Sequence, residues 1–127
     1  MKNSSGIHWL RVLLGGFLAE VAVIAVVIPA SLLLGKQVIP YVALLGSLLA
    51  CFLFAVWVGR RIGSQFILHG ILVGVVATLL YVGLTLGRPE PLAYLAAHGL
   101  KIIGGAAGGF VAGRQHGPAS AATTVAR

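Results

Sequence analysis

Two charged residues, Glu20 and Lys101, lie well inside long apolar stretches of the chain. If these stretches cross a membrane, a charge at the centre costs roughly 2.5–3.5 kcal/mol on the insertion scale, so such residues normally face protein, water or an opposite charge. Small neighbours favour an inward orientation, because Gly16 lies one turn before Glu20, and Gly104 and Gly105 lie one turn after Lys101. We therefore expect any chemistry of this chain at these two positions.

The depths of Glu20 and Lys101 can be compared by counting from a cation at the same end of each stretch. Glu20 lies nine residues from Arg11, or about 13.5 Å along a helix, and Lys101 lies thirteen residues from Arg114, or about 19.5 Å. The difference of about 6 Å is within the reach of two long side chains. The spacing predicts an ion pair between the first and the fourth apolar stretch.

Three interpretations of these charges are open. The pair can specify packing alone, Glu20 can titrate in a polar pathway, or Lys101 can extend its ammonium outward to the interface. His98 lies one turn before Lys101 and is a candidate proton relay or a simple hydrogen-bonding group. The other histidines are expected near the interface on the side of the termini, without a special role: His8, His69 and His116.

The remaining reactive side chains are few. The chain has one cysteine, Cys51, two acidic residues and no two histidines at helical i, i+4 spacing, so we expect neither a metal site nor a cofactor. It also lacks a serine, histidine and acid constellation or a pair of carboxylates, so we do not expect an enzyme.

The composition indicates the environment of these residues. The chain has 127 residues, of which 59% are hydrophobic and only 9% are charged, against about 25% charged in an average globular protein. A small soluble domain buries only about 60% of the surface that its unfolded chain exposes, so this apolar excess needs lipid as its partner. The nine Lys and Arg residues behind the net charge of +7 lie singly or in one pair near the ends of apolar stretches rather than in a patch, which argues against nucleic-acid binding.

Apolar stretches of membrane-spanning length predict an all-α bundle of four transmembrane helices, at 9–34, 40–58, 67–87 and 92–113. Because the turns are short, we expect consecutive helices to be antiparallel neighbours. Residues 1–116 form one domain in this interpretation, and 117–127 form a flexible cytoplasmic tail. The first stretch contains Glu20 and is too long for the core of a signal peptide, so we expect it to be retained.

The distribution of cations predicts the orientation. The side of both termini carries Lys2, Arg11, Arg60, Arg61, Arg114 and Arg127, whereas the other side carries Lys36 and Arg88. The positive-inside rule then predicts a multi-pass protein of the cell membrane with both termini in the cytoplasm. The aromatic residues Trp9 and Trp57 are expected at the cytoplasmic interface, and Tyr41 and Tyr94 at the opposite one.

Glycines in the fourth stretch predict close helix packing. Gly105, Gly109 and Gly113 form a GxxxGxxxG row, and Gly104 and Gly108 form a second row beside it. Without Cβ atoms, such a face lets another helix backbone approach closely. The partner can be a helix of the same chain, a second copy in a homo-oligomer or another membrane protein.

A weak internal repeat raises the hypothesis of a duplicated helical hairpin. A shift of 54 residues lays Leu14, Gly16, Leu18 and Val21 on Leu68, Gly70, Leu72 and Val75, and lays Gly59 and Arg60 on Gly113 and Arg114. The two hairpins would then be parallel repeats related by an axis along the membrane normal.

Two resemblances bear on function. The segment 15–21, Gly-Gly-Phe-Leu-Ala-Glu-Val, resembles the first helix of the small multidrug resistance transporters, whose embedded glutamate binds protons and cationic drugs in turn. This implies the same role for Glu20, although the third stretch lacks the family's Trp and Lys101 would repel a cationic substrate. The glycine and arginine signature of the fluoride channels is absent. As a whole, the chain resembles uncharacterised small four-helix membrane proteins of bacteria in length and in its Gly-rich second turn and fourth helix.

The sequence thus favours a non-enzymatic integral membrane protein. Its main interpretation is a structural or interaction protein that packs through the Gly-rich fourth helix and a buried Glu20–Lys101 pair. The alternative is a small ion- or proton-coupled transporter in which Glu20 titrates.

Overall fold

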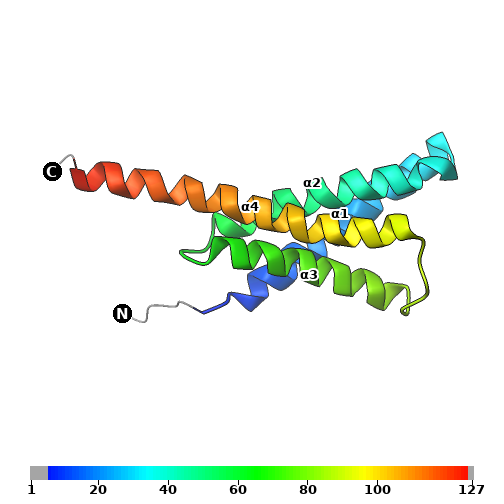
Figure 1. The fold of residues 1–127 in the computed structure, drawn as a ribbon, viewed down its shortest axis with the longest axis horizontal. Coiled ribbons are helices and arrows are strands. Elements are labelled where there is room, and N and C mark those ends of the chain that lie inside the picture. The colour runs from blue at the N-terminus through cyan, green and yellow to red at the C-terminus, as the bar shows by residue number, and fades with distance from the viewer. Residues whose placement is uncertain (1–5, 126–127) are drawn as a thin grey trace.

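The fold was described from a computed structural model, which covers residues 6–125, with side chains described as far as His116. Four helices follow one another: α1 (Trp9–Leu34), α2 (Ile39–Gly59), α3 (Phe66–Leu84) and α4 (Leu92–Val125), with a 3-10 turn, η1 (Lys36–Val38), before α2 (Figure 1). The described residues contain no strand. The prediction of an all-α fold with four helices is confirmed.

The helix boundaries follow local backbone chemistry. α1 and α2 lie within a residue of the predicted stretches, and Pro40 stands in the first turn of α2, where a missing N–H is tolerated. α3 ends at Leu84, three residues earlier than predicted, because Leu86 and Gly87 have positive φ angles of 55° and 66°. The Gly87 N–H donates to the carbonyl of Val82 at 3.0 Å, which satisfies one of the free carbonyls at the helix end.

The last helix is longer than the sequence predicted. α4 continues from Leu92 to Val125, although the part long and apolar enough to cross a membrane is Leu92–His116. The backbone of 117–125 is thus helical where a flexible tail was predicted, and residues 126–127 lie outside the described part of the chain.

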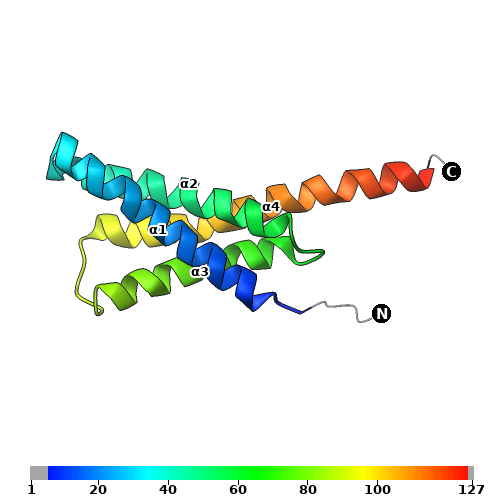
Figure 2. The same ribbon diagram turned by 180° about the vertical axis from the view of Figure 1, so that it is seen from behind.

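Consecutive helices are in contact, but the arrangement of the four helices around the bundle goes beyond what the sequence predicted. α1 packs on α2 and α3 on one face, and α4 packs on α2 and α3 on the opposite face, as the views from front and back show (Figures 1 and 2). The main neighbour of α2 is therefore α4, and the consecutive helices α2 and α3 meet along the diagonal of the bundle. The short turns predict that consecutive helices run antiparallel, but they do not predict that α2 packs mainly on α4.

This arrangement bears on the hypothesis of a duplicated hairpin. In the structure the first hairpin, α1 and α2, packs beside the second, with α1 against α3 and α2 against α4. Duplication of the hairpin as such stays a hypothesis.

Glycines set the distance between α4 and its two neighbours. A Cβ atom at Gly104 or Gly108 would collide with backbone of α2, at Leu48 and Phe52. A Cβ atom at Gly105 or Gly109 would collide with backbone of α3, and one at Gly113 would crowd the side chain of Phe66. Both glycine rows of α4 thus face helices of the same chain.

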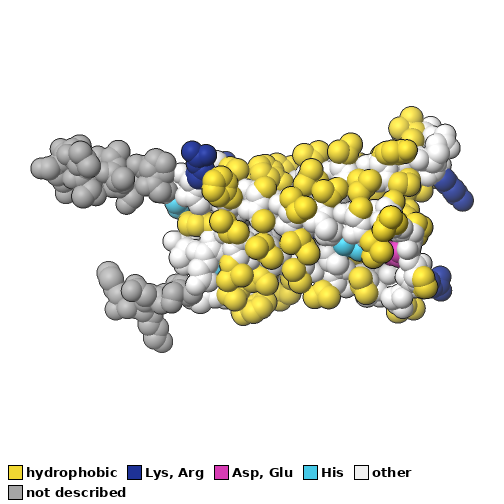
Figure 3. Space-filling view, viewed as in Figure 1, with side chains coloured by type: hydrophobic (Ala, Val, Ile, Leu, Met, Phe, Trp, Pro, Cys, Tyr) yellow, Lys and Arg dark blue, Asp and Glu magenta, His cyan; other side chains and the backbone are white. Residues whose placement is uncertain are grey.

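The outer surface of the bundle is apolar between two charged ends. Large apolar side chains remain exposed along every helix, among them Leu10, Leu33, Leu45, Leu53, Leu79 and Leu95. In the space-filling view they cover the middle of the molecule, and Lys and Arg appear at its two ends (Figure 3). Soluble monomers rarely expose apolar surface on this scale. All four helices have the length and composition to cross a membrane.

Candidate functional site

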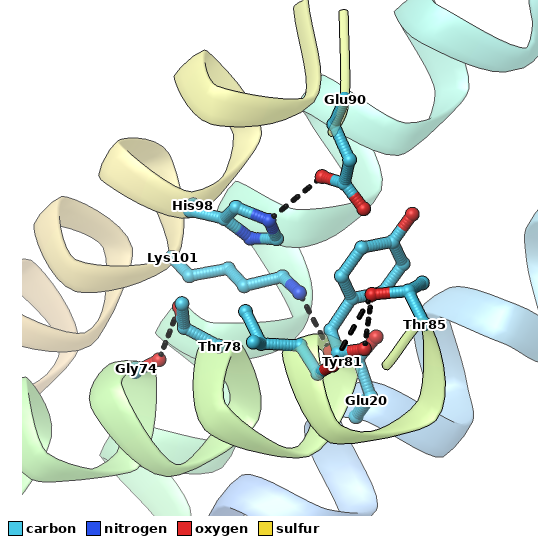
Figure 4. Close-up of polar contacts among 9 residues, drawn as sticks. Glu20, Gly74, Thr78, Tyr81, Thr85, Glu90, His98 and Lys101 are labelled. Carbon is cyan, nitrogen blue, oxygen red and sulfur yellow. Dashed lines mark hydrogen bonds and ion pairs between the residues drawn. The ribbon is translucent and has the colours of Figure 1, made fainter. Parts of the chain in front are cut away.

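The two charged residues singled out in the sequence meet in the core of the bundle. The ammonium Nζ of Lys101 donates to Oε2 of Glu20 at 2.7 Å (Figure 4). The two side chains are 2% and 4% exposed, so the contact is buried inside the bundle. A buried ion pair of this length combines a charge-assisted hydrogen bond with the neutralisation of both charges.

The pair bridges two helices whose backbones do not approach each other. No Cα atom of α1 lies within 8 Å of one of α4 in the described chain, so the side chains cross the diagonal of the bundle between α2 and α3. Small residues make room for this crossing. Ser47 of α2 and Ala77 of α3 are buried beside it, and at Gly74 a Cβ would collide with the backbone of Lys101.

The bundle is tightly closed on the side of the termini. Ala19, Cys51 and Ala77 form a fully buried apolar cluster from three helices, and Ala19 directly precedes Glu20 in the chain. Farther toward the termini, the close approach of α4 to α2 and α3 at its glycines leaves no room for side chains between them. Glu20 is therefore shielded from that end.

On the other side of the pair lies a cavity of about 260 Å³. Its apolar wall comes from α1 and α2, and includes Val23, Val27, Ile39 and Ala43. Its polar lining consists of Glu20, Ser47, Tyr81, Tyr94, His98 and Lys101. The cavity thus extends from the pair away from the termini, toward the end of the bundle at which α1 joins α2 and α3 joins α4. The two hairpins separate at that end (Figures 1 and 2).

Tyr81, His98 and Glu90 continue the polar lining outward. The Tyr81 ring lies 4.9 Å from the Lys101 ammonium, a cation–π distance, and its centroid lies 5.0 Å from that of the His98 ring. Nε2 of His98 faces Oε2 of Glu90 at 3.3 Å, and the side chains are 13% and 14% exposed. Nδ1 of His98 is buried without a hydrogen-bond partner and is turned toward the Lys101 side (Figure 4).

Glu90 and Tyr81 belong to the site although the sequence did not single them out. Glu90 lies just before the start of α4, and its carboxylate faces His98 of that helix (Figure 4). Tyr81 lies on α3, with its ring beside the Lys101 ammonium. A tyrosine inside a stretch that also faces a buried charge is the signal that would have identified it.

His69 is a second polar residue that sequence reasoning undervalued. It was expected at the interface, but its side chain is buried, with a relative exposure of 1%. Its Nδ1 lies 2.8 Å from the Gln65 carbonyl, and the backbone N–H of His8 donates to its Nε2 at 3.1 Å. Since Nε2 accepts, Nδ1 carries the proton and donates to Gln65, which fixes the neutral tautomer.

The described residues hold no group of three or more His, Cys, Asp or Glu side chains that is suited to bind a metal ion. The polar cluster is instead a carboxylate and an ammonium with a tyrosine and an imidazole beside them. Such a set can hold or move a proton and can bind a small charged group.

Fold and site together define a bundle of four apolar helices with a diagonal carboxylate–ammonium pair beneath a one-sided cavity. Comparisons of the chain with protein-family models, with curated proteins and with solved structures found no match. Function is therefore argued from the site itself.

Proposed function

We propose that this protein is a multi-pass integral membrane protein whose buried Glu20–Lys101 pair holds the bundle in one arrangement, and that its role is structural or one of interaction with other membrane components. The observation that carries the proposal is the 2.7 Å contact between two side chains that cross the bundle where the backbones of α1 and α4 do not approach each other. Substitution of either residue would leave the charge of the other unpaired in an apolar environment, which is costly at this depth.

The proposed orientation places both termini in the cytoplasm, because the side of the bundle with the termini carries the larger share of the Lys and Arg residues. Partner binding would use the lipid-facing surface, because both glycine rows of α4 are occupied within the chain. A homo-oligomer therefore needs another face, such as the exposed leucine side of α2 at Leu45, Leu49 and Leu53.

A double-mutant cycle tests the structural role. Unfolding in detergent is compared for the wild type, Glu20→Gln, Lys101→Met and the double variant. Each single substitution leaves a buried group unpaired and is expected to cost about 3–5 kcal/mol. The double variant should lose less than the sum, with a coupling above about 1 kcal/mol. Lys36→Met, which removes an exposed lysine outside the pair, is the matched control and should unfold like the wild type.

A second function, proton- or ion-coupled transport through Glu20, is supported by the cavity that ends on this residue. Transport would require the apolar cluster on the terminal side to open in alternation with the cavity. Flux of protons into liposomes that contain the purified protein, read with a pH-sensitive dye, tests this directly. Glu20→Gln should abolish a flux that depends on this carboxylate, and a flux equal to that of empty liposomes would reject transport of protons under these conditions.

A further inference from the structure

The cavity beside the Glu20–Lys101 pair has the composition of a binding site. Its floor holds the only described charge pair in the core, and its walls divide into an apolar side from α1 and α2 and a polar side dominated by α4. Cavities that bind small molecules have this combination of apolar walls and a few convergent polar groups. Binding at this site uses the same Glu20–Lys101 pair as the functions proposed above, but it requires neither transport nor a partner protein.

We propose that this cavity binds a small monocarboxylate with a short apolar tail, and that Glu20 takes up one proton when the ligand binds. The carboxylate replaces Glu20 as the partner of the Lys101 ammonium, and the tail lies along Val23, Val27 and Ile39.

The excess of hydrogen-bond donors selects a carboxylate over an amine. An ammonium has three N–H donors, and Lys101 uses one of them on Glu20. The hydroxyl groups of Ser47, Tyr81 and Tyr94 add further donors around the cavity. Glu20 is the one anionic group in the lining, and its Oε2 is already occupied by Lys101. The lining therefore offers more hydrogen bonds to a ligand rich in acceptors than to a cation.

Charge balance explains the linked proton. The empty site is neutral, because Glu20 is an anion and Lys101 a cation. A second anion in this apolar surrounding would leave one negative charge unpaired, which is costly at low dielectric. If Glu20 binds a proton as the ligand enters, the Lys101 ammonium pairs with the ligand carboxylate and the site stays neutral. One proton and one carboxylate enter, and no other bond is formed or broken.

The titratable groups around Glu20 are the ones that can compete for this proton. They are Lys101, His98 and Tyr94 on α4, Tyr81 on α3 and Cys51 on α2. Glu90 is farther out, faces His98 and does not line the cavity. Removing the Glu20 carboxylate therefore isolates its contribution from those of its neighbours.

The size of the cavity limits the length of the tail. A volume of about 260 Å³ holds about eight or nine groups, at about 30 Å³ for each water-sized group. Hexanoate, with six carbon and two oxygen atoms, fills it. Affinity should therefore rise roughly fourfold for each methylene added from propionate to hexanoate and then level off, since one buried methylene contributes about this factor.

Isothermal titration calorimetry of the purified protein in detergent tests the proposal, with propionate, butyrate and hexanoate and with hexylamine as the matched cation. Between about pH 6 and pH 8 these acids are already ionised in solution. If binding takes up one proton, the affinity should fall about tenfold for each unit by which the pH rises. Titrations in two buffers of different ionisation enthalpy give the number of protons taken up on binding. Equal or tighter binding of hexylamine, or no carboxylate binding by the folded protein, would overturn the proposal.

Two variants locate the ligand. Glu20→Gln should still bind hexanoate, but without proton uptake and with an affinity independent of pH, because Lys101 is then free to pair with it. Ala43→Leu fills the cavity from the α2 wall without touching the pair and should weaken binding at least tenfold, whereas Leu53→Ala on the exposed side of α2 should bind like the wild type. The ¹³C shift of carboxyl-labelled hexanoate should report an ionised carboxylate when bound. A protonated ligand, or pH-dependent binding to Glu20→Gln, would contradict the proton on Glu20.

Discussion

Gly70 of α3 and Gly105 of α4 lie so close that a Cβ atom on either one would collide with the carbonyl oxygen of the other. This reciprocal contact lies one turn from Lys101 on α4, so it sets the distance between the two helices beside the buried pair. Helices without side chains at their crossing approach closely enough for dispersion contacts along the whole interface.

Gly105→Ala should therefore destabilise the protein by about 1–3 kcal/mol, because the added methyl group forces α3 and α4 apart. Gly99→Ala is the matched control on the same helix, since a Cβ atom there meets nothing within 4 Å. It should leave stability unchanged or raise it by up to about 1 kcal/mol, as alanine is the better helix former. Unfolding in detergent measures both, and equal effects of the two substitutions would contradict the close contact.

The two acidic residues should differ strongly in their effect on stability. Glu20→Gln leaves the buried ammonium of Lys101 without a counter-charge and should cost about 3–5 kcal/mol. Glu90→Gln should cost about 1 kcal/mol or less, because the amide oxygen can still accept the His98 N–H at the more open end of the site. Thermal unfolding of both variants under the same conditions provides the comparison. A larger loss for Glu90→Gln would show that the pair is not the main polar contact.

Removal of the His69 imidazole should release the start of α1. The backbone N–H of His8 donates to Nε2 of His69 at 3.1 Å. His69→Phe keeps a ring at this position but removes the acceptor, so the His8 N–H loses its partner. The protection factor of the His8 amide against hydrogen exchange should fall accordingly. The Gly35 amide, which donates to the Ser31 carbonyl at 3.1 Å, serves as the reference that should not change.

The proposed orientation can be read from two exposed turn residues. Ser64 lies in the turn between α2 and α3, at the same end of the bundle as the termini, and Gln37 lies in η1 at the opposite end. Each is replaced by cysteine in a Cys51→Ala background. A membrane-impermeant maleimide added to intact cells should label Gln37→Cys, and should label Ser64→Cys only after the cells are opened. The reverse pattern would place both termini outside.

Sequence reasoning determined positions along the membrane normal better than positions around the bundle. Counting from Arg11 and Arg114 gave the similar depths of Glu20 and Lys101, because helix rise is constant and cations mark the ends of apolar stretches. The α2–α4 contact was not foreseen. The helices are apolar on nearly every side, so periodicity does not show which face of α2 is buried.

The outer part of the site escaped prediction for a related reason. Glu90 and His98 come together through the path of the turn between α3 and α4, and this path depends on the left-handed backbone at Leu86 and Gly87. A leucine in that conformation is unusual and is not foreshadowed by its side chain. The cavity depends on how far the two hairpins separate. This separation results from packing between helices, so it cannot be predicted from the sequence of any single helix.

The diagonal position of the pair has a consequence for biosynthesis. Lys101 follows Glu20 by 81 residues, so a ribosome has to produce the first three spans before the partner of this carboxylate exists. During that interval Glu20 must remain protonated, hydrated or in contact with the insertion machinery, because lipid does not solvate a lone carboxylate. A nascent chain that stops before α4 would carry this unpaired group into the bilayer, and cellular quality control could recognise the incomplete product by it.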